Sequence, residues 1–145
     1  MQKFAIKLFS FPFYLHFEAY DDSIEDILEH RGCFSIHYRD SGRKVLTFSD
    51  GKSYRAEVPS FTIEITDSRQ LAEAFRKWFD FACGNNMWVL TQNAGIDYIN
   101  NYASFTDPLI LYTNHDAYGI TLLSQDHRFQ TAKQVEEYIT KYIDY

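Results

Sequence analysis

Two His–Asp pairs are the residues of this sequence best suited to metal binding or acid–base chemistry. His115 and Asp116 follow one expected strand, and Asp126 and His127 follow the next. A zinc or non-haem iron site needs two or three such ligands on one rigid face. Both pairs fall in expected loops, where nothing in the sequence fixes the distance between them. Turn formation alone also explains Asn114 and Asp116, because Asn and Asp favour turns.

The same region supports one functional hypothesis, a small-molecule or nucleotide site between sheet and helices, with or without hydrolysis. Cys33 and Cys83 are too few and too far apart for a zinc site or a disulfide framework, and we expect both thiols to be at least half buried. Phosphate-binding glycine loops, nucleophile elbows, HExxH and paired CxxC motifs are absent from the sequence. We therefore expect no enzyme, no catalytic residue, no metal site and no cofactor. The polar contributors to a ligand site would be Tyr112, Asn114, His115, Asp116, His127 and Arg128.

An acidic cluster near the N-terminus supports a second hypothesis, which is protein binding. A negative surface attracts a basic partner, speeds the encounter and fixes its register. The alternative is an ordinary solvated helix face, whose acidic first turns suit the helix dipole. Six carboxylates fall within a dozen residues that contain no lysine or arginine: Glu18, Asp21, Asp22, Glu25, Asp26 and Glu29.

Tyrosine is the second feature of this predicted partner-binding surface. Aromatic residues make up 18% of the chain, and 11 of them are tyrosines. A domain of this size cannot bury so many hydroxyls with partners, and tyrosine is enriched at protein interfaces. Tyr14 and Tyr20 lie next to the acidic cluster and join it in the hypothesis. The alternative is that these tyrosines are half-exposed side chains at the rim of the core.

The charge of the whole chain narrows the class of partner. The formal net charge is −6, which disfavours direct binding of nucleic-acid phosphates and allows a basic protein partner. No apolar run approaches the roughly 18 residues of a membrane span, and no A-x-A-like cleavage site follows the N-terminal apolar run. We expect a cytoplasmic protein that occludes a basic surface of a larger, nucleic-acid-processing partner, as an inhibitor, an immunity protein or a phage-type anti-defence (anti-CRISPR-like) protein. A third hypothesis is a homo-oligomeric structural or accessory protein, which would show a larger mass in solution.

The periodicity of the chain predicts a single α+β domain over residues 1–145. We expect a largely antiparallel sheet with about four helices packed mainly on one face. Alternating apolar residues predict the strands, and capped amphipathic stretches predict the helices. The expected strands are 3–9, 13–20, a meander over 33–65, 87–90, 109–112 and 118–123. The expected helices are 22–32, 67–84, 94–103 and a last helix from Thr131 to Ile143.

The helix at 67–84 organises the predicted fold. Asp67 is its expected N-cap, Gly84 its expected left-handed C-terminal residue, and Trp78 the centre of its buried aromatic stripe.

Two dipeptides set the expected register of the meander. Ser41-Gly42 and Asp50-Gly51 predict two-residue hairpin turns. This register places Lys44 opposite Glu57 and ends a strand before Pro59. It brings one set of mostly apolar residues to a common face: Phe34, Ile36, Tyr38, Val45, Thr47, Tyr54, Ala56 and Val58.

Overall fold

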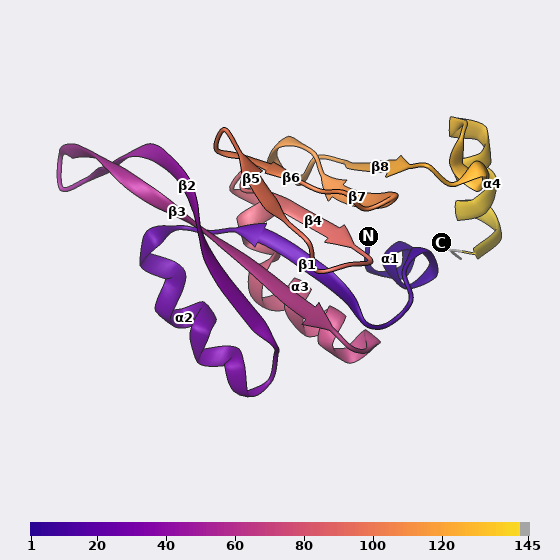
Figure 1. The fold of residues 1–145 in the computed structure, drawn as a ribbon, viewed down its shortest axis with the longest axis horizontal. Coiled ribbons are helices and arrows are strands. Elements are labelled where there is room, and N and C mark those ends of the chain that lie inside the picture. The colour runs from indigo at the N-terminus through magenta and orange to yellow at the C-terminus, as the bar shows by residue number, and fades with distance from the viewer. Residues whose placement is uncertain (143–145) are drawn as a thin grey trace.

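The computed structural model describes residues 1–142, which form a single α+β domain (Figure 1). Ile143, the predicted end of the last helix, lies outside the described residues. The α-helices are α1 (Gln2–Leu8), α2 (Ile24–Leu28), α3 (Ser68–Cys83) and α4 (Ala132–Tyr142). The strands are β1 (Phe13–Glu18), β2 (Ile36–Ser49), β3 (Lys52–Ile65), β4 (Trp88–Thr91), β5 (Asp97–Ile99), β6 (Tyr102–Ser104), β7 (Leu109–Thr113) and β8 (Ile120–Ser124). Short 3-10 turns are η1 (Asp21–Ser23), η2 (Glu29–Gly32), η3 (His115–Ala117) and η4 (His127–Phe129).

Six of the described strands form one sheet in the order β2-β3-β1-β4-β7-β8, and β5 and β6 form a separate two-stranded sheet. Every neighbouring pair is antiparallel. The predicted α+β class with a largely antiparallel sheet is therefore confirmed. No helix within residues 1–142 combines the length and the apolar character that a membrane crossing requires.

The main core lies between α3 and one face of the sheet. Phe13, Leu15 and Phe17 alternate along β1, and none of the three is accessible to solvent. The Phe17 ring stacks on Trp78 of α3, with 5.5 Å between ring centroids. The aromatic side chains of α3 therefore pack on the sheet and bury the core, as their helical spacing predicted.

The second face of β1 is also buried, because residues 92–108 cross it. Figure 1 shows β5 and β6 on the side of the sheet opposite α3. Phe105 packs on the imidazole of His16 at 5.2 Å, and Ile96 of the same crossing segment is buried. β1 is therefore covered on both faces, although its sequence alternates like a half-exposed strand.

Residues 3–9 were expected as a strand, and this prediction is wrong, because they form helix α1. Phe4 and Ala5 are buried and Leu8 is half buried, whereas Ile6 is exposed. The buried positions therefore follow helical spacing. A short apolar run fits both periods, and packing on the core decides between them.

Residues 94–103 were expected as a helix, and they instead form the β5–β6 hairpin. Asn100 and Asn101 take positive φ values of 52° and 66°, as a two-residue turn that matches the strand twist requires. Ile96 is buried as expected, but Ile99 projects into solvent. Asn100 and Asn101, which are poor helix formers, therefore form the turn of this hairpin.

The meander over 33–65 consists of two long strands, β2 and β3, joined by one turn, where two turns were expected. Asp50 and Gly51 make the expected turn, and Lys44 Nζ lies 2.7 Å from Glu57 Oε1 as predicted. Ser41 and Gly42 do not turn the chain, because they belong to a bulge in β2. The Ser41 hydroxyl donates a 2.6 Å hydrogen bond to the Val58 carbonyl and holds this bulge against β3.

The bulge also corrects the predicted faces of the meander. Ile36 pairs with Ile63, on the α3 side, whereas Val45 pairs with Ala56 on the alternate side. Pro59 does not end a strand, since β3 runs through it at the bulge, where a ladder donor is dispensable.

The predicted N-cap of α3 is confirmed, but the predicted left-handed residue at its C-terminal end is wrong. Asp67 accepts a 2.8 Å hydrogen bond from the Gln70 amide, as an N-cap does. Gly84 has φ −82°, and the left-handed residue is Asn85, with φ 63°. Cys83 and Cys33 are both exposed, contrary to expectation.

Candidate interaction surface

The acidic residues sit on a short helical segment whose outer side faces solvent. Asp22, Glu25, Asp26 and Glu29 are exposed, and Asp21 is half buried. Within residues 1–142, none of the five has an ion-pair partner. Their contacts are local, such as the Asp22 amide donating 3.0 Å to Asp21 Oδ1. We call these five residues the acidic segment.

Glu18 does not belong to this surface, which corrects its predicted role. It is 3% exposed on the face of β1 that residues 92–108 cover. Its carboxylate pairs with the Arg43 guanidinium and accepts a 3.1 Å hydrogen bond from the Tyr98 hydroxyl. Burial, and then the charge of Glu18, raise the pKa of Tyr98. Glu18 is therefore a buried partner in an ion pair with Arg43, and it does not contribute to the negative charge of the protein surface.

Tyr14 is likewise set apart from the acidic segment. It is half buried on β1, opposite Glu64 of β3 and Thr91 of β4. Tyr20 is 48% exposed, and its ring packs on Phe81 at 5.7 Å. Of the two predicted tyrosines, only Tyr20 adjoins the acidic segment.

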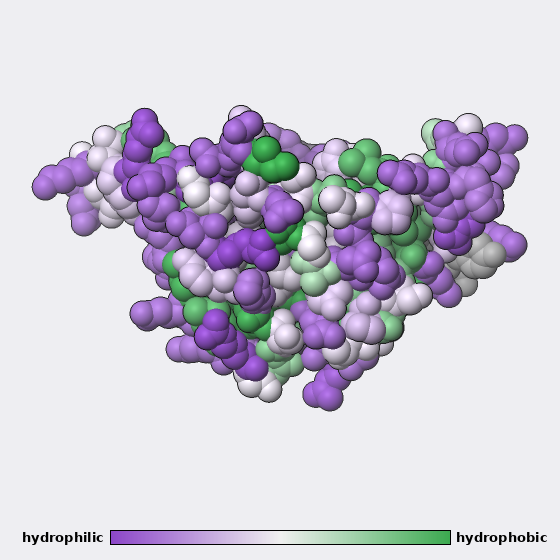
Figure 2. Space-filling view, in the orientation of Figure 1, coloured by the Kyte–Doolittle hydropathy of each residue, from purple (hydrophilic) through white to green (hydrophobic). Residues whose placement is uncertain are grey.

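A projecting hairpin stands beside the acidic segment. Beyond the bulge, residues 44–57 of β2 and β3 extend past the rest of the domain, at the left of Figure 1. We call this part the arm. Leu46 and Phe48 are 63% and 74% exposed, and Val45 and Tyr54 are also exposed. Figure 2 shows that the arm stands clear of the rest of the surface, with apolar atoms among its polar ones.

A groove of about 380 Å³ separates the arm from the acidic segment. Asn86 lines this groove, and its side-chain amide nitrogen has no hydrogen-bond partner among the described residues. The groove therefore has apolar side chains of the arm on one side and carboxylates of the acidic segment on the other. The remaining lining residues are Ala19, Tyr20, Asp21 and Asp22 on one side, and 45–49, Tyr54 and 56–58 on the other.

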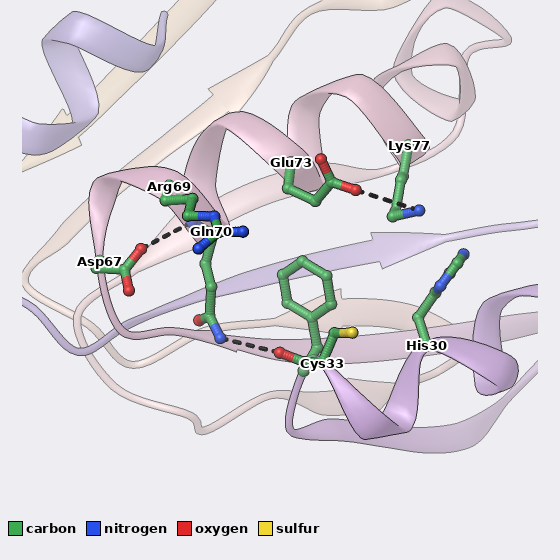
Figure 3. A pocket seen from close by; sticks show the side chains of 8 residues that line it. His30, Cys33, Asp67, Arg69, Gln70, Glu73 and Lys77 are labelled. Atoms are coloured by element: carbon green, nitrogen blue, oxygen red, sulfur yellow. Dashed lines mark hydrogen bonds and ion pairs between the residues drawn. The ribbon is translucent and has the colours of Figure 1, made fainter.

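A second groove, of about 410 Å³, lies between η2 and the start of α3 (Figure 3). Its polar groups already bind one another: Gln70 Nε2 donates 3.0 Å to the Cys33 carbonyl, and Glu73 lies 3.3 Å from Lys77 Nζ. Hydrogen bonds from Arg76 lower the pKa of Glu73 to about 2. The Gln70–Cys33 hydrogen bond joins α3 to the residue after η2 across 37 positions of sequence, which is why the sequence did not indicate it. The pairs of Glu73 with Arg76 and Lys77 lie within α3.

The predicted ligand site is not assembled. His115 and His127 lie at opposite ends of the β7–β8 hairpin, and a five-residue strand spans roughly 17 Å. Tyr112, Asn114 and His115 line a hollow of about 190 Å³ together with 85–89, but His127 and Arg128 are not part of it.

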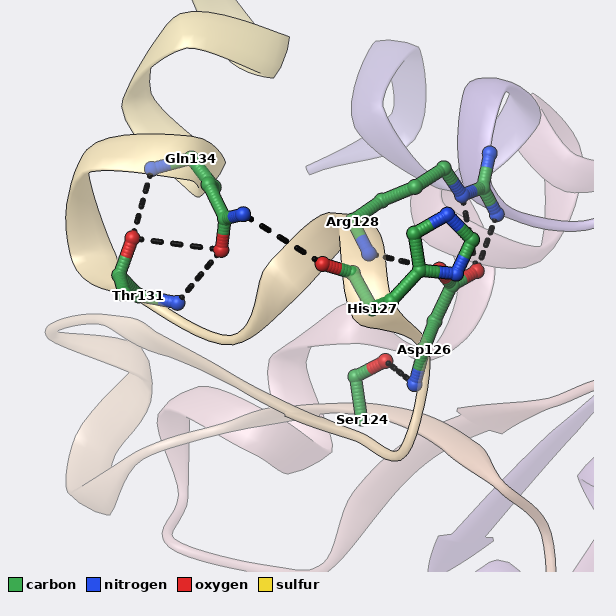
Figure 4. Close-up of polar contacts among 6 residues, drawn as sticks. All are labelled: Ser124, Asp126, His127, Arg128, Thr131 and Gln134. Carbon is green, nitrogen blue, oxygen red and sulfur yellow. Dashed lines mark hydrogen bonds and ion pairs between the residues drawn. The ribbon is translucent and has the colours of Figure 1, made fainter.

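Local contacts explain the polar residues of that hairpin. Asp126 caps η4, and its Oδ2 lies 2.6 Å from Arg128 (Figure 4), which lowers the pKa of Asp126 to about 2. Asn114 Oδ1 accepts a 2.6 Å hydrogen bond from Thr121, and His115 Nδ1 lies 2.8 Å from Asp116. Across residues 1–142 there is no group of three His, Cys, Asp or Glu side chains placed to bind a metal.

The arm, the groove and the acidic segment therefore form one continuous surface, which we take as the candidate interaction surface of the described chain. It joins exposed apolar side chains to carboxylates that have no ion-pair partner in the described part of the chain. Exposed apolar patches and complementary charge are features of protein–protein contact surfaces in general. No protein-family model, curated protein or solved structure matches this chain.

Proposed function

We propose that this protein is a binding inhibitor that occludes a basic surface on a larger, nucleic-acid-processing protein. In this proposal the acidic segment faces the basic groups that would otherwise hold a phosphate backbone. The arm reaches over the partner and contributes apolar contact area. An immunity or anti-defence role is the biological setting that such an inhibitor suits.

The observation that carries the proposal is the proximity of unneutralised carboxylates to an exposed apolar hairpin. Asp22 and Phe48 line the same groove, and both are exposed to solvent. Carboxylates alone steer association but add little affinity after desolvation, whereas buried apolar contacts slow dissociation. A surface that offers both provides fast association together with a long residence time.

We expect reversal of the acidic segment, by Asp22→Lys with Glu25→Lys and Asp26→Lys, to weaken partner binding by roughly 100-fold or more, mainly through the association rate. The partner is first captured from the native host lysate on immobilised wild-type protein and identified by mass spectrometry. Its association with wild type and variant is then measured by biolayer interferometry at low and moderate salt. Raised salt should slow wild-type association and leave that of the variant nearly unchanged.

A matched control reverses three exposed carboxylates elsewhere, with Asp97→Lys, Glu136→Lys and Glu137→Lys. This control makes the same change in net charge and should retain most of the binding. The proposal also requires that wild-type protein inhibit the nucleic-acid-processing activity of the captured partner. Equal binding by the two triple variants, or a partner without a basic surface, would contradict it.

A further inference from the structure

The two outer strands of the six-stranded sheet are protected very differently. β2 carries a bulge at 41–43 and the charged side chains of Arg39, Asp40 and Lys44, which are common devices against edge-to-edge pairing. β8 has no bulge, and residues 117–125 contain no proline, lysine, arginine, histidine or carboxylate. Among the described strands, only β7 pairs with β8. The outer edge of β8 is therefore an open strand edge without charge.

The register of β7 and β8 shows which backbone groups face outward. The Asn114 amide donates 2.8 Å to the Gly119 carbonyl, and the Gln125 amide donates 2.8 Å to the Pro108 carbonyl. Hydrogen-bonded positions alternate in an antiparallel pair, so Thr121 and Leu123 also bond to β7. The alternate residues direct their N–H and C=O groups away from the sheet: Ile120, Leu122 and Ser124.

We propose that the open edge of β8 pairs with β8 of a second copy of this chain and forms an antiparallel two-fold dimer. With Leu122 on the two-fold axis, Ile120 of each copy faces Ser124 of the other, and every outward backbone group has a partner. The two sheets then continue as one. Ile120 and Leu123, which are 42% and 51% exposed, lose solvent contact on the two faces of the joined sheet. Figure 2 shows apolar atoms at the surface over β8.

Charge favours a second copy at this place. Two chains of net charge −6 repel each other over most of their surfaces. The strip at 117–125 contains no carboxylate, so pairing two copies along it brings no like charges together. The antiparallel arrangement sets the end that carries Asp116 beside the end that carries the Asp126–Arg128 ion pair of the other copy. Two five-residue strands bury less than the roughly 1,200 Å² of a standard interface. The dimer is therefore weak and depends on concentration.

The test is the mass of the full-length chain, measured by analytical ultracentrifugation over roughly a hundredfold range of concentration. The weight-average mass should rise from 17.1 kDa toward the dimer value. Leu123→Lys places charge on the paired strands, and Ile120→Pro removes an outward N–H that β7 does not use. Each variant should raise the dissociation constant roughly tenfold or more. Far-UV circular dichroism verifies the fold, and two variants keep the test decisive if one of them is unstable.

Leu46→Lys is the matched control, because it adds the same charge at an exposed leucine on the arm, and it should dimerise like wild type. Hydrogen exchange adds a residue-level readout: the amides of Ile120, Leu122 and Ser124 should gain protection as concentration rises, whereas Thr121 and Leu123 should be protected throughout. A mass of 17.1 kDa at every concentration overturns the proposal. A dimer that both β8 variants leave intact overturns it as well.

Discussion

Replacing Trp78 with alanine should lower the free energy of unfolding by about 3–5 kcal/mol. The indole is 3% exposed, stacks on Phe17 at 5.5 Å, and packs against the tilted ring of Phe34 at 5.0 Å. Alanine leaves a cavity where α3, β1 and the segment after η2 meet, and these elements cannot all move inward to fill it. Chemical denaturation followed by circular dichroism measures the change without relying on tryptophan fluorescence.

An exposed aromatic residue, Phe48, provides a control for the stability loss expected of Trp78→Ala. Phe48 is 74% exposed on the arm, so Phe48→Ala should change stability by less than about 0.5 kcal/mol. The same variant should weaken partner binding if the arm contacts the partner. A loss below about 1 kcal/mol for Trp78→Ala would mean that α3 does not seal the core.

Prediction from sequence succeeded where independent local signals agreed. At α3 the Asp67 cap and the stripe around Trp78 both indicated a helix over the same residues. At the tip of the arm, the Asp50-Gly51 turn and the Lys44–Glu57 pair required the same register. A local sequence pattern predicts structure reliably when a second, separate signal requires the same element or the same register.

Prediction failed where two local readings were both allowed and distant contacts chose between them. Ser41 and Gly42 suit a hairpin turn and also suit a bulge. In the structure β3 pairs with β2 from Lys52 to Ile63 and with β1 from Ser60 to Ile65, and Ser41 and Gly42 form the bulge within the pairing with β2. In the same way, residues 3–9 and 94–103 take the structure that lets Phe4 and Ile96 reach the core.

The acidic cluster shows the same limit at the candidate site. Sequence spacing grouped Glu18 with Asp21 and Asp22, since all are acidic and close in the chain. It could not reveal that Arg43, 25 positions away, neutralises Glu18 inside the fold. The arm was also missed as a surface, because its apolar residues alternate like those of a core-facing strand.

His16 should make the stability of this protein fall steeply in mild acid. The imidazole is inaccessible to solvent, and burial lowers its pKa from 6.5 to about 4, with a smaller contribution from the charge of Arg39. Thr91 Oγ1 donates 2.7 Å to the Asn93 carbonyl, so it accepts from His16 Nε2–H at 2.8 Å. Thr62 then donates to His16 Nδ1 at 2.9 Å. The fold therefore holds the neutral ring in one tautomer.

The sign of the pH effect follows from this protonation state. Between pH 6.5 and pH 4 the unfolded chain binds a proton at His16 that the native protein does not bind. Stability is therefore lost as pH falls through this window, by about 3 kcal/mol in total. Above pH 6.5 the ring is neutral in both states, and His16 contributes no slope.

Denaturant unfolding of wild type and His16→Gln at several pH values isolates this contribution, because the carboxylates affect both proteins alike. The stability advantage of wild type should shrink by about 3 kcal/mol on going from neutral pH to pH 4. His127→Gln is the control, since that side chain is 89% exposed, and it should follow the wild-type profile. NMR titration of the native imidazole gives a reading that does not depend on a variant. A His16 ring that gains its proton near pH 6.5, or parallel pH profiles for wild type and His16→Gln, would show that residues 92–108 do not exclude water from this face of β1.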